Sequence, residues 1–335
     1  MLASDATAAV VVVANRSAGE VRFIATPAQG KPQQYTVASS DLAVVPTTGP
    51  VEIAFDVGKE RRRYQLDPDT AYYFGDHAKG LDLREIRIGA AGQGQPSRPS
   101  PLPDKASPAQ PRVLTVKILV DQKELMARAA WEKRLRARLD AVSQTLERVC
   151  RVKLKVVATE EWQSNEALTD LRESLADFER KVKAHPAQLA IGFTSQSLRE
   201  AEENRSGVTR AALHDRILIR EWRPATESGR IDVLLHELGH YLGATHSPEP
   251  DSVMRPLLGD NPRVRANWRC SFDPVNALVM NLVADEIFDR GIRHLGKVAP
   301  STRERLRQIY EDLAQTLPDD PTPDQYLNLL GRAND

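Results

Sequence analysis

A proline-rich segment divides this sequence into two unequal parts. Within residues 90–111, glycine, serine and glutamine separate six prolines: Pro96, Pro99, Pro101, Pro103, Pro108 and Pro111. Proline fixes φ and has no backbone N–H to donate, so such a segment forms neither a helix nor a core strand and stays extended. We therefore expect residues 90–111 to be a linker between a domain at 1–89 and a second domain at 112–335.

The first part has the pattern of short β-strands. Runs rich in valine, isoleucine, tyrosine and phenylalanine recur about every ten residues, with turn residues between them. The first run, Ala8 to Ala14, is apolar throughout, which is typical of a buried strand. This spacing predicts an all-β, sandwich-like domain. No cluster in it resembles a catalytic site, so its candidate role is to dock a protein or carbohydrate partner.

The second part has the hydrophobic patterns of both strands and long helices. Val113 to Val120 is an apolar run fit for a buried strand, and a long amphipathic helix at about 122–149 follows. Further strands and helices alternate up to a helix that begins near Ile231. This order predicts an α/β (α+β) domain with a mixed, mostly parallel sheet. Two more helices are expected at about 273–289 and 301–316.

Charge and hydropathy exclude two classes of function. The chain has 46 lysines and arginines and 46 aspartates and glutamates, so its net charge is zero at neutral pH. The overall charge therefore gives no sign of a basic surface, although local patches stay open, and nucleic acid is not a predicted partner. No segment has the roughly 18 consecutive apolar residues that span a membrane.

The chemistry is concentrated in residues 236–246, which read His-Glu-Leu-Gly-His-Tyr-Leu-Gly-Ala-Thr-His. His236 and His240 are four residues apart, so on a helix both project from one face and are able to share a metal ion. Gly243 tolerates the left-handed conformation that ends a helix, which allows His246 to return to the same ion. Three neutral imidazoles leave a fourth zinc position for water.

A plain helix is the alternative explanation for this motif. The first five residues alone would arise by chance in about one chain in a hundred, and often inside ordinary helices. Adding Gly243 and His246 at fixed offsets lowers that chance to roughly one in a hundred thousand. The leucines of the segment, in contrast, are expected to be core residues of the helix.

The complete motif resembles the metzincin signature HExxHxxGxxH. Ser252-Val253-Met254-Arg255-Pro256 follows where metzincins have a methionine turn, and its Met-x-Pro sequence is most similar to the matrixin branch. The resemblance implies a metzincin-like zincin catalytic domain with an active-site helix and one catalytic Zn²⁺ bound by His236, His240 and His246. It further implies that Glu237 is the general base of a peptidase and that Met254 packs beneath the imidazoles.

The resemblance also implies a peptide or protein substrate, bound along an edge strand by β-augmentation. In metzincins this strand precedes the active-site helix and runs antiparallel to the bound peptide. The candidate strand here consists of Val208, Thr209, Arg210, Ala211, Ala212 and Leu213.

The two cysteines, Cys150 and Cys270, leave two alternatives. A disulfide between them would fit an oxidising compartment, and two buried free thiols are nearly as well supported. The chain shows no basic start or long apolar run of a secretory signal. Since the resemblance points to a protease, we expect a secreted or periplasmic protein whose signal has been removed.

Three functions compete at this point. The leading interpretation is a zinc metalloendopeptidase whose β domain docks a partner or substrate. The second is a non-proteolytic zinc-binding protein in which the β domain is the binding module, although Glu237 would then have no purpose. The third is a smaller enzyme whose N-terminal region is a removable pro-segment.

Overall fold

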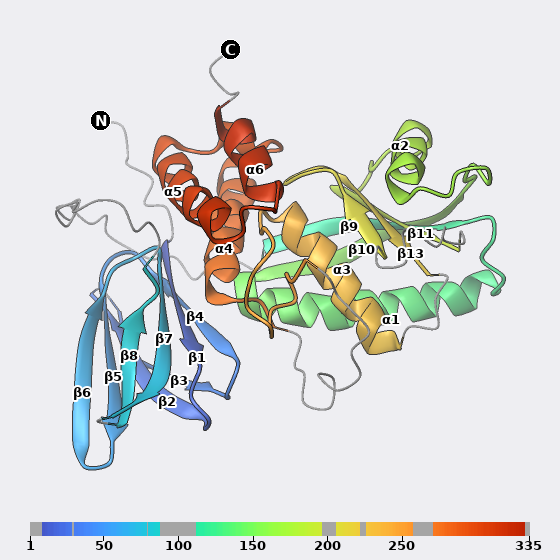
Figure 1. Ribbon diagram of the computed structural model, residues 1–335. Helices are drawn as coiled ribbons and strands as arrows, with labels where there is room; N and C mark the ends of the chain where they lie inside the picture. Colours follow the sequence, from blue (N-terminus) through green and yellow to red (C-terminus); the bar gives the residue numbers. More distant parts are fainter. Residues whose placement is uncertain are drawn as a thin grey trace.

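The computed structural model describes residues 9–28, 30–78, 80–87, 112–195, 206–221, 226–256 and 271–331. The expected linker at 90–111 lies outside these residues, so the proposed domain boundaries stay a prediction. Figure 1 shows a β-rich N-terminal region, an α/β region and a group of C-terminal helices between them. The order predicted from the sequence, a β region followed by an α/β region, is therefore confirmed.

The N-terminal region packs two β-sheets face to face. In the described residues one sheet has the order β4-β1-β7-β8 and the other the order β3-β2-β5-β6. Their inner faces enclose a core of valine, isoleucine, leucine and aromatic side chains. The strands are β1 (Ala9–Asn15), β2 (Val21–Pro27), β3 (Gln33–Val37), β4 (Leu42–Thr47), β5 (Val51–Val57), β6 (Glu60–Leu66), β7 (Thr70–His77) and β8 (Gly80–Glu85).

The uninterrupted apolar run of β1 has a structural cause, because both faces of this strand are covered. Val11 and Val13 face the core of the sandwich. Val10, Val12 and Ala14 belong instead to the large core that contains the C-terminal helices. A strand with one solvated face would alternate polar and apolar residues, as Val21–Pro27 partly does.

The α/β region is built on a five-stranded sheet with the order β10-β9-β11-β13-β12. The first four strands in this order are parallel to their neighbours, and β12 pairs antiparallel with β13. A mixed, mostly parallel sheet was predicted and is confirmed. Its strands are β9 (Arg112–Asp121), β10 (Val152–Trp162), β11 (Leu189–Thr194), β12 (Gly207–Thr209) and β13 (Arg216–Arg220).

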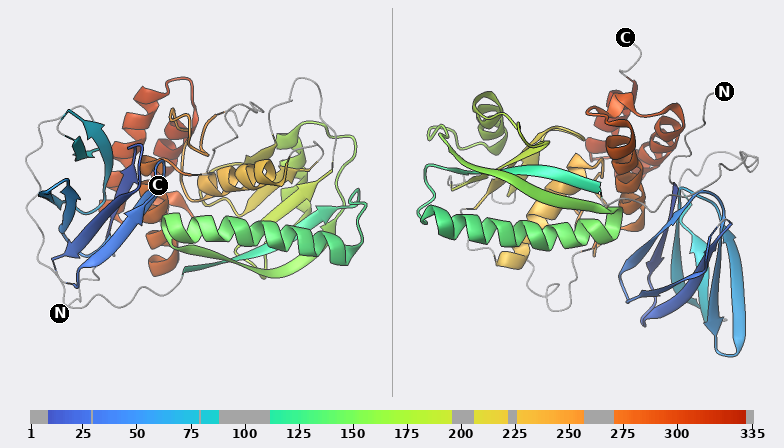
Figure 2. Two further views of the ribbon diagram at one scale, coloured as in Figure 1. Left: turned by 90° about the horizontal axis from the view of Figure 1, so that it is seen from below. Right: turned by 180° about the vertical axis from the view of Figure 1, so that it is seen from behind.

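Helices cover both faces of this sheet (Figure 2). Helix α1 (Arg128–Cys150) and helix α3 (Glu227–Tyr241) pack with the side chains of one face of β9, such as Leu114 and Ile118. Helix α2 (Leu171–Lys181) covers the opposite face with Leu171, Leu175 and Phe178. None of the helices in the described ranges is long and apolar enough to cross a membrane.

The C-terminal helices lie between the sandwich and the α/β region (Figures 1 and 2). The two parts of the chain are in direct contact there. Residues of β1, together with Leu42 and Ala71, share one hydrophobic core with α4. The reason is the second apolar face of β1. The helices are α4 (Pro274–Arg290), α5 (Pro300–Thr316) and α6 (Thr322–Gly331), with a short 3₁₀ turn at η3 (Leu295–Lys297).

The predicted edge strand is shorter than expected. Strand β12 contains Val208 and Thr209, but Arg210, Ala211, Ala212 and Leu213 form a turn. Two observations explain the turn. Leu213 adopts a positive φ of 61°, and its N–H donates to the carbonyl of Tyr241, 2.9 Å away. Ala212 and Leu213 therefore pack into the core beneath α3 rather than extend the sheet.

Of the two alternatives for the cysteines, Cys150 follows the free thiol and not the disulfide. This residue is a free, fully buried cysteine at the end of α1. Its Sγ donates to the carbonyl of Leu146 at 3.2 Å, and burial raises the pKa of the thiol to about 12. Cys270 lies outside the described residues. The thiol of Cys150 therefore behaves as a core side chain.

Candidate metal centre

Helix α3 is held rigidly at its first turn. The hydroxyl of Thr226 accepts from the N–H of Gly229 at 3.2 Å and so caps the helix. The side chain of Arg138, which is fully buried, donates to both oxygens of Glu227 at 2.6 and 3.0 Å. The same guanidinium binds Glu221 at the end of β13. These contacts fix the helix that carries the histidines against α1 and the sheet.

His236 and His240 use their Nδ1 atoms for backbone contacts. Nδ1 of His236 lies 2.9 Å from the carbonyl oxygen of Val253. Nδ1 of His240 lies 2.9 Å from the carbonyl oxygen of Ala244. A carbonyl only accepts, so each Nδ1 carries the proton and each Nε2 presents its lone pair. The two Nε2 atoms are 3.0 Å apart, close to the spacing of about 3.3 Å that two nitrogens have on a tetrahedral zinc.

Gly243 turns the chain back toward the helix, as the sequence suggested. Its φ is +89°, and an added Cβ would lie 2.9 Å from Val283 and 3.0 Å from the hydroxyl of Tyr310. Beyond the turn, Asn276 of α4 holds Thr245 with its side-chain amide, accepting from the N–H at 2.9 Å and donating to the carbonyl at 3.0 Å. His246 follows directly and is directed to the other two histidines.

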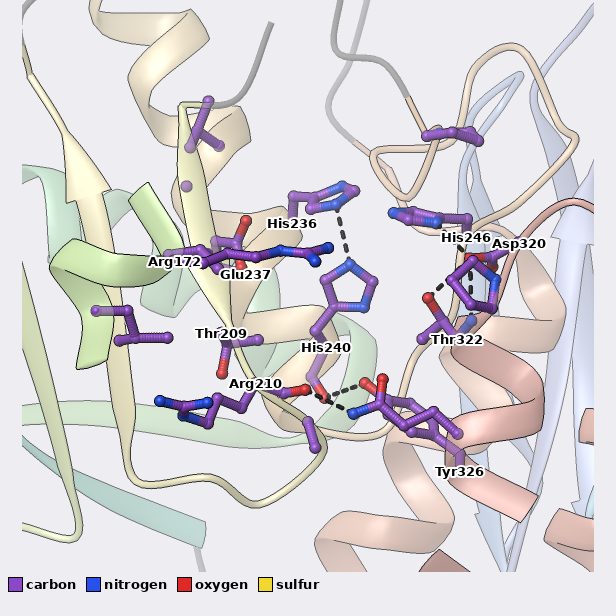
Figure 3. Close-up of a pocket in the computed structure, with 18 of the residues that line it drawn as sticks. Arg172, Thr209, Arg210, His236, Glu237, His240, His246, Asp320, Thr322 and Tyr326 are labelled. Atoms are coloured by element: carbon purple, nitrogen blue, oxygen red, sulfur yellow. Dashed lines mark hydrogen bonds and ion pairs between the residues drawn. The ribbon is translucent and has the colours of Figure 1, made fainter. Parts of the chain in front are cut away.

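The three imidazoles converge on one point (Figure 3). One ring nitrogen from each of His236, His240 and His246 lies within 4.8 Å of the others. Nδ1 of His246 is 3.0 Å from Oδ1 of Asp320, so all three rings direct Nε2 inward. The residues therefore fit a zinc ion, since each side chain supplies a lone pair and each Nδ1 has an acceptor.

Burial keeps two of these imidazoles uncharged. It lowers the pKa of His236 to about 4. For His240, burial and then the nearby His236 and His246 lower the pKa well below its ordinary value. Neutral imidazoles are the form that binds a metal ion, so neither of these two residues has to lose a proton at neutral pH.

Glu237 lies beside the histidines in a cavity of about 840 Å³. The cavity runs between β12 and the start of α6, and Figure 3 shows Glu237 and Arg172 on one side and Asp320 and Thr322 on the other. Glu237 as a whole residue is 5% exposed. An added Cβ on Gly207 would lie 2.8 Å from its Oε1. Gly207 therefore gives the carboxylate room next to β12.

Met254 packs beneath α3. It is fully buried, and its sulfur would lie only 2.5 Å from a Cβ added to Gly239. Its carbonyl accepts from the N–H of Ser247 at 2.8 Å, and its N–H donates to the hydroxyl of Ser252 at 3.1 Å. The glycine between the two helical histidines thus makes space for this methionine.

Sequence reasoning missed the residues that support the histidines from the C-terminal helices. Asp320 contacts His246, the hydroxyl of Tyr326 donates to the carbonyl of His240 at 3.2 Å, and that of Tyr310 donates to the carbonyl of Gly243 at 2.9 Å. These residues lie far from the histidines in the sequence, so no short motif contains both sets. The available signal was an apolar stripe with tyrosines in two helices, which is equally typical of an ordinary core.

Comparison with known protein families gives a match over the central part of the chain. Residues 159–270 match the family model described as Matrixin, peptidase M10, which covers about a third of the chain. The match confirms the metzincin resemblance. Asp320 and the C-terminal helices lie beyond the matched residues. Among curated proteins, none matches the chain.

Two solved structures have limited similarity to this chain. Archaemetzincin from Methanopyrus kandleri is 17% identical with a TM-score of 0.34, and the alignment covers 53% of this chain and 94% of that one. A chaperone–substrate complex is 11% identical with a TM-score of 0.37, over 83% of this chain and 42% of that one. Neither similarity is strong enough to carry an argument. The matrixin match and the three-histidine cluster support a zinc metallopeptidase.

Proposed function

We propose that the protein is a zinc-dependent endopeptidase, with zinc bound by His236, His240 and His246 and with Glu237 as general base and acid. The observation that carries the proposal is the convergence of three Nε2 atoms while every Nδ1 has an acceptor. Such ligands are fixed in tautomer and direction before any ion binds. An ordinary buried histidine would need neither an Nε2 that points at two other imidazoles nor an acceptor for its Nδ1 proton.

The proposed mechanism gives Glu237 the proton transfers. When bound, zinc would polarise the scissile carbonyl and acidify a water molecule in the cavity. The carboxylate of Glu237 takes the proton of that water as it attacks, and then delivers the proton to the departing amine. Its burial beside Gly207 supports this role, because a desolvated carboxylate in a fixed position is an effective base.

The substrate is proposed to bind along β12. This strand ends the described sheet, and Gly207, Val208 and Thr209 line the same cavity as the histidines. A peptide added to its free edge would place its backbone beside Glu237 by β-augmentation. Only Val208 and Thr209 of the expected strand keep this role. Arg210 and Ala211 also line the cavity, but as part of the turn.

A peptide-library experiment tests this proposal. The wild type is expected to cleave internal peptide bonds, while Glu237→Gln retains zinc and loses activity by a factor of about 10²–10⁴ or more. Glu311→Gln, which changes an exposed glutamate of α5, is the matched control and should cleave like the wild type. Cleavage by Glu237→Gln at the wild-type rate would refute the assigned base.

The same experiment separates the competing function. A wild type that binds zinc but cleaves no peptide would favour a zinc-binding protein whose N-terminal β region is the binding module. We also propose a location outside the cytoplasm. Because Cys150 is a free thiol, this location depends on the family resemblance alone.

A further inference from the structure

The three candidate ligands differ in what accepts their Nδ1 protons. His236 and His240 donate to the carbonyls of Val253 and Ala244, which lie within the motif region itself. His246 donates instead to a carboxylate, that of Asp320, located in the turn between α5 and α6. A charged acceptor makes a roughly twofold stronger hydrogen bond than a neutral one. One ligand of the three therefore has a chemically distinct support.

Asp320 is held in place for this contact. Its side chain is 5% exposed. Its Oδ1 accepts from the N–H of Thr322 at 3.1 Å, from the hydroxyl of Thr322 at 2.8 Å and from His246 at 3.0 Å. Its Oδ2 is buried and accepts no hydrogen bond from the described residues. The stability of this buried charge therefore depends on the donors at Oδ1, and His246 is one of them.

We infer that Asp320 is a positioning residue that orients His246 and strengthens its bond to zinc, so that the C-terminal helices complete the metal site. This inference rests on the proposed function. The carboxylate holds the proton on Nδ1 and therefore the lone pair on Nε2. It also raises the electron density of the imidazole, which makes Nε2 a better donor to a cation.

Charge balance supports the same assignment. Zinc and three neutral imidazoles carry a charge of about +2 in a site that is largely removed from water. Asp320 and Glu237 are the acidic side chains that line the cavity in the described residues. Arg172 and Arg210 line the same cavity, and Arg210 is paired with Glu179. Asp320 is in direct contact with His246, so its carboxylate offsets part of the charge of the ion, which favours binding.

Neighbouring contacts hold the turn that presents Asp320. Tyr326 of α6 donates to the carbonyl of His240 at 3.2 Å, and Gln325 donates to the carbonyl of Arg210 at 2.8 Å. The C-terminal helices thus contact both the ligand helix and the turn that follows β12. Figure 3 shows Asp320, Thr322 and Tyr326 on the same side of the histidines.

A purely structural role for Asp320 makes a different prediction. Its bonds to Thr322, the first residue of α6, resemble those of a helix cap, whose loss destabilises the fold by about 0.5–2 kcal/mol. A cap would affect the stability of the metal-free protein but not the intrinsic affinity for zinc. The affinity for zinc and the stability of the metal-free protein must therefore be measured separately.

The test uses the full chain, stripped of metal and titrated with zinc against a chromophoric chelator. Asp320→Ala is expected to weaken zinc binding by a factor of about 10–100. Asp320→Asn keeps an oxygen that accepts from Nδ1 but loses the charge. Its zinc affinity should therefore lie between that of Asp320→Ala and that of the wild type. Asp319→Asn is the matched control, because it removes the same charge from an exposed neighbour, and it should bind like the wild type.

Two further measurements identify the cause. Cobalt substitution should give a visible spectrum for Asp320→Ala that differs from the wild-type spectrum, because a free His246 changes the ligand geometry. Thermal melts of the metal-free variants show whether folding is retained. Asp320→Asn keeps the hydrogen-bond acceptor and provides the result if Asp320→Ala does not fold.

The outcomes separate this inference from the proposed function. Zinc affinities of the folded variants equal to that of the wild type would overturn the role of Asp320 while leaving the zinc site intact. A change in apo stability alone would show a helix cap and would also overturn it. A wild type that binds no zinc would overturn the proposed function, and with it this inference.

Discussion

Two segments far apart in the sequence meet at the candidate metal centre, and they contribute in different ways. Residues 236–254 supply the three imidazoles, Glu237 and the buried methionine beneath them. Residues 310–326 supply no ligand, but their side chains contact three points of the first segment: the carbonyls of His240 and Gly243 and the ring of His246. The first segment provides the chemistry, and the second holds it in position.

The difference follows from what each role requires. A shared metal ion requires particular side chains at fixed intervals on one helix and its turn. A supporting contact requires only a donor or acceptor that the fold brings within about 3 Å. Many residue types and many places in the chain satisfy the second requirement. Ligands therefore leave a pattern in the sequence, whereas their supports do not.

The largest stability effect is expected where the two segments touch, at Gly243. Replacing it with alanine forces a side chain into a left-handed φ and places its Cβ 2.9 Å from Val283 and 3.0 Å from Tyr310. Strain and crowding together should lower the free energy of unfolding by roughly 2–4 kcal/mol in urea denaturation.

Gly291 provides the matched control for this substitution. It also has a left-handed φ, of +68°, but a Cβ there would meet nothing within 4 Å. Gly291→Ala should therefore lose only the backbone contribution of about 1–2 kcal/mol. Equal losses in the two variants would mean that crowding against Val283 and Tyr310 adds nothing at Gly243.

A smaller effect is expected from cutting the linker, which tests how firmly the two parts of the chain are held together. We propose that residues 1–89 and 112–335 are separate domains, and limited proteolysis should cut between residues 90 and 111. Because Val10, Val12 and Ala14 share a core with α4, the two pieces should elute together in gel filtration under native conditions. Separation into two independent species would contradict the importance of that shared core.

The sequence predicted the site better than its surroundings, for physical reasons visible in particular residues. His236, His240 and Gly243 were assigned from helix periodicity and the left-handed turn, both of which are local properties. Arg210 to Leu213 were wrongly assigned to a strand, since the bond from Leu213 to Tyr241 that ends β12 is a tertiary contact. Cys150 was left between a disulfide and a buried free thiol, because sequence spacing does not reveal how its side chain packs.

The same limit applies to the sandwich. Alternation and turn residues were enough to predict strands in residues 1–89. The apolar run in β1 also predicted burial, but not what covers its second face. That partner is α4, which begins at Pro274, and no local pattern connects the two. A long-range partner becomes visible only when the fold is known.

The most direct test of this account is the zinc content and coordination of the purified wild-type chain. After dialysis against trace zinc at neutral pH, metal analysis should give one zinc per chain. X-ray absorption should then show three imidazole nitrogens at about 2.0–2.1 Å and one further oxygen ligand from water. A stoichiometry near zero, or a zinc without three histidine nitrogens, would contradict the central claim that these imidazoles form a catalytic zinc site.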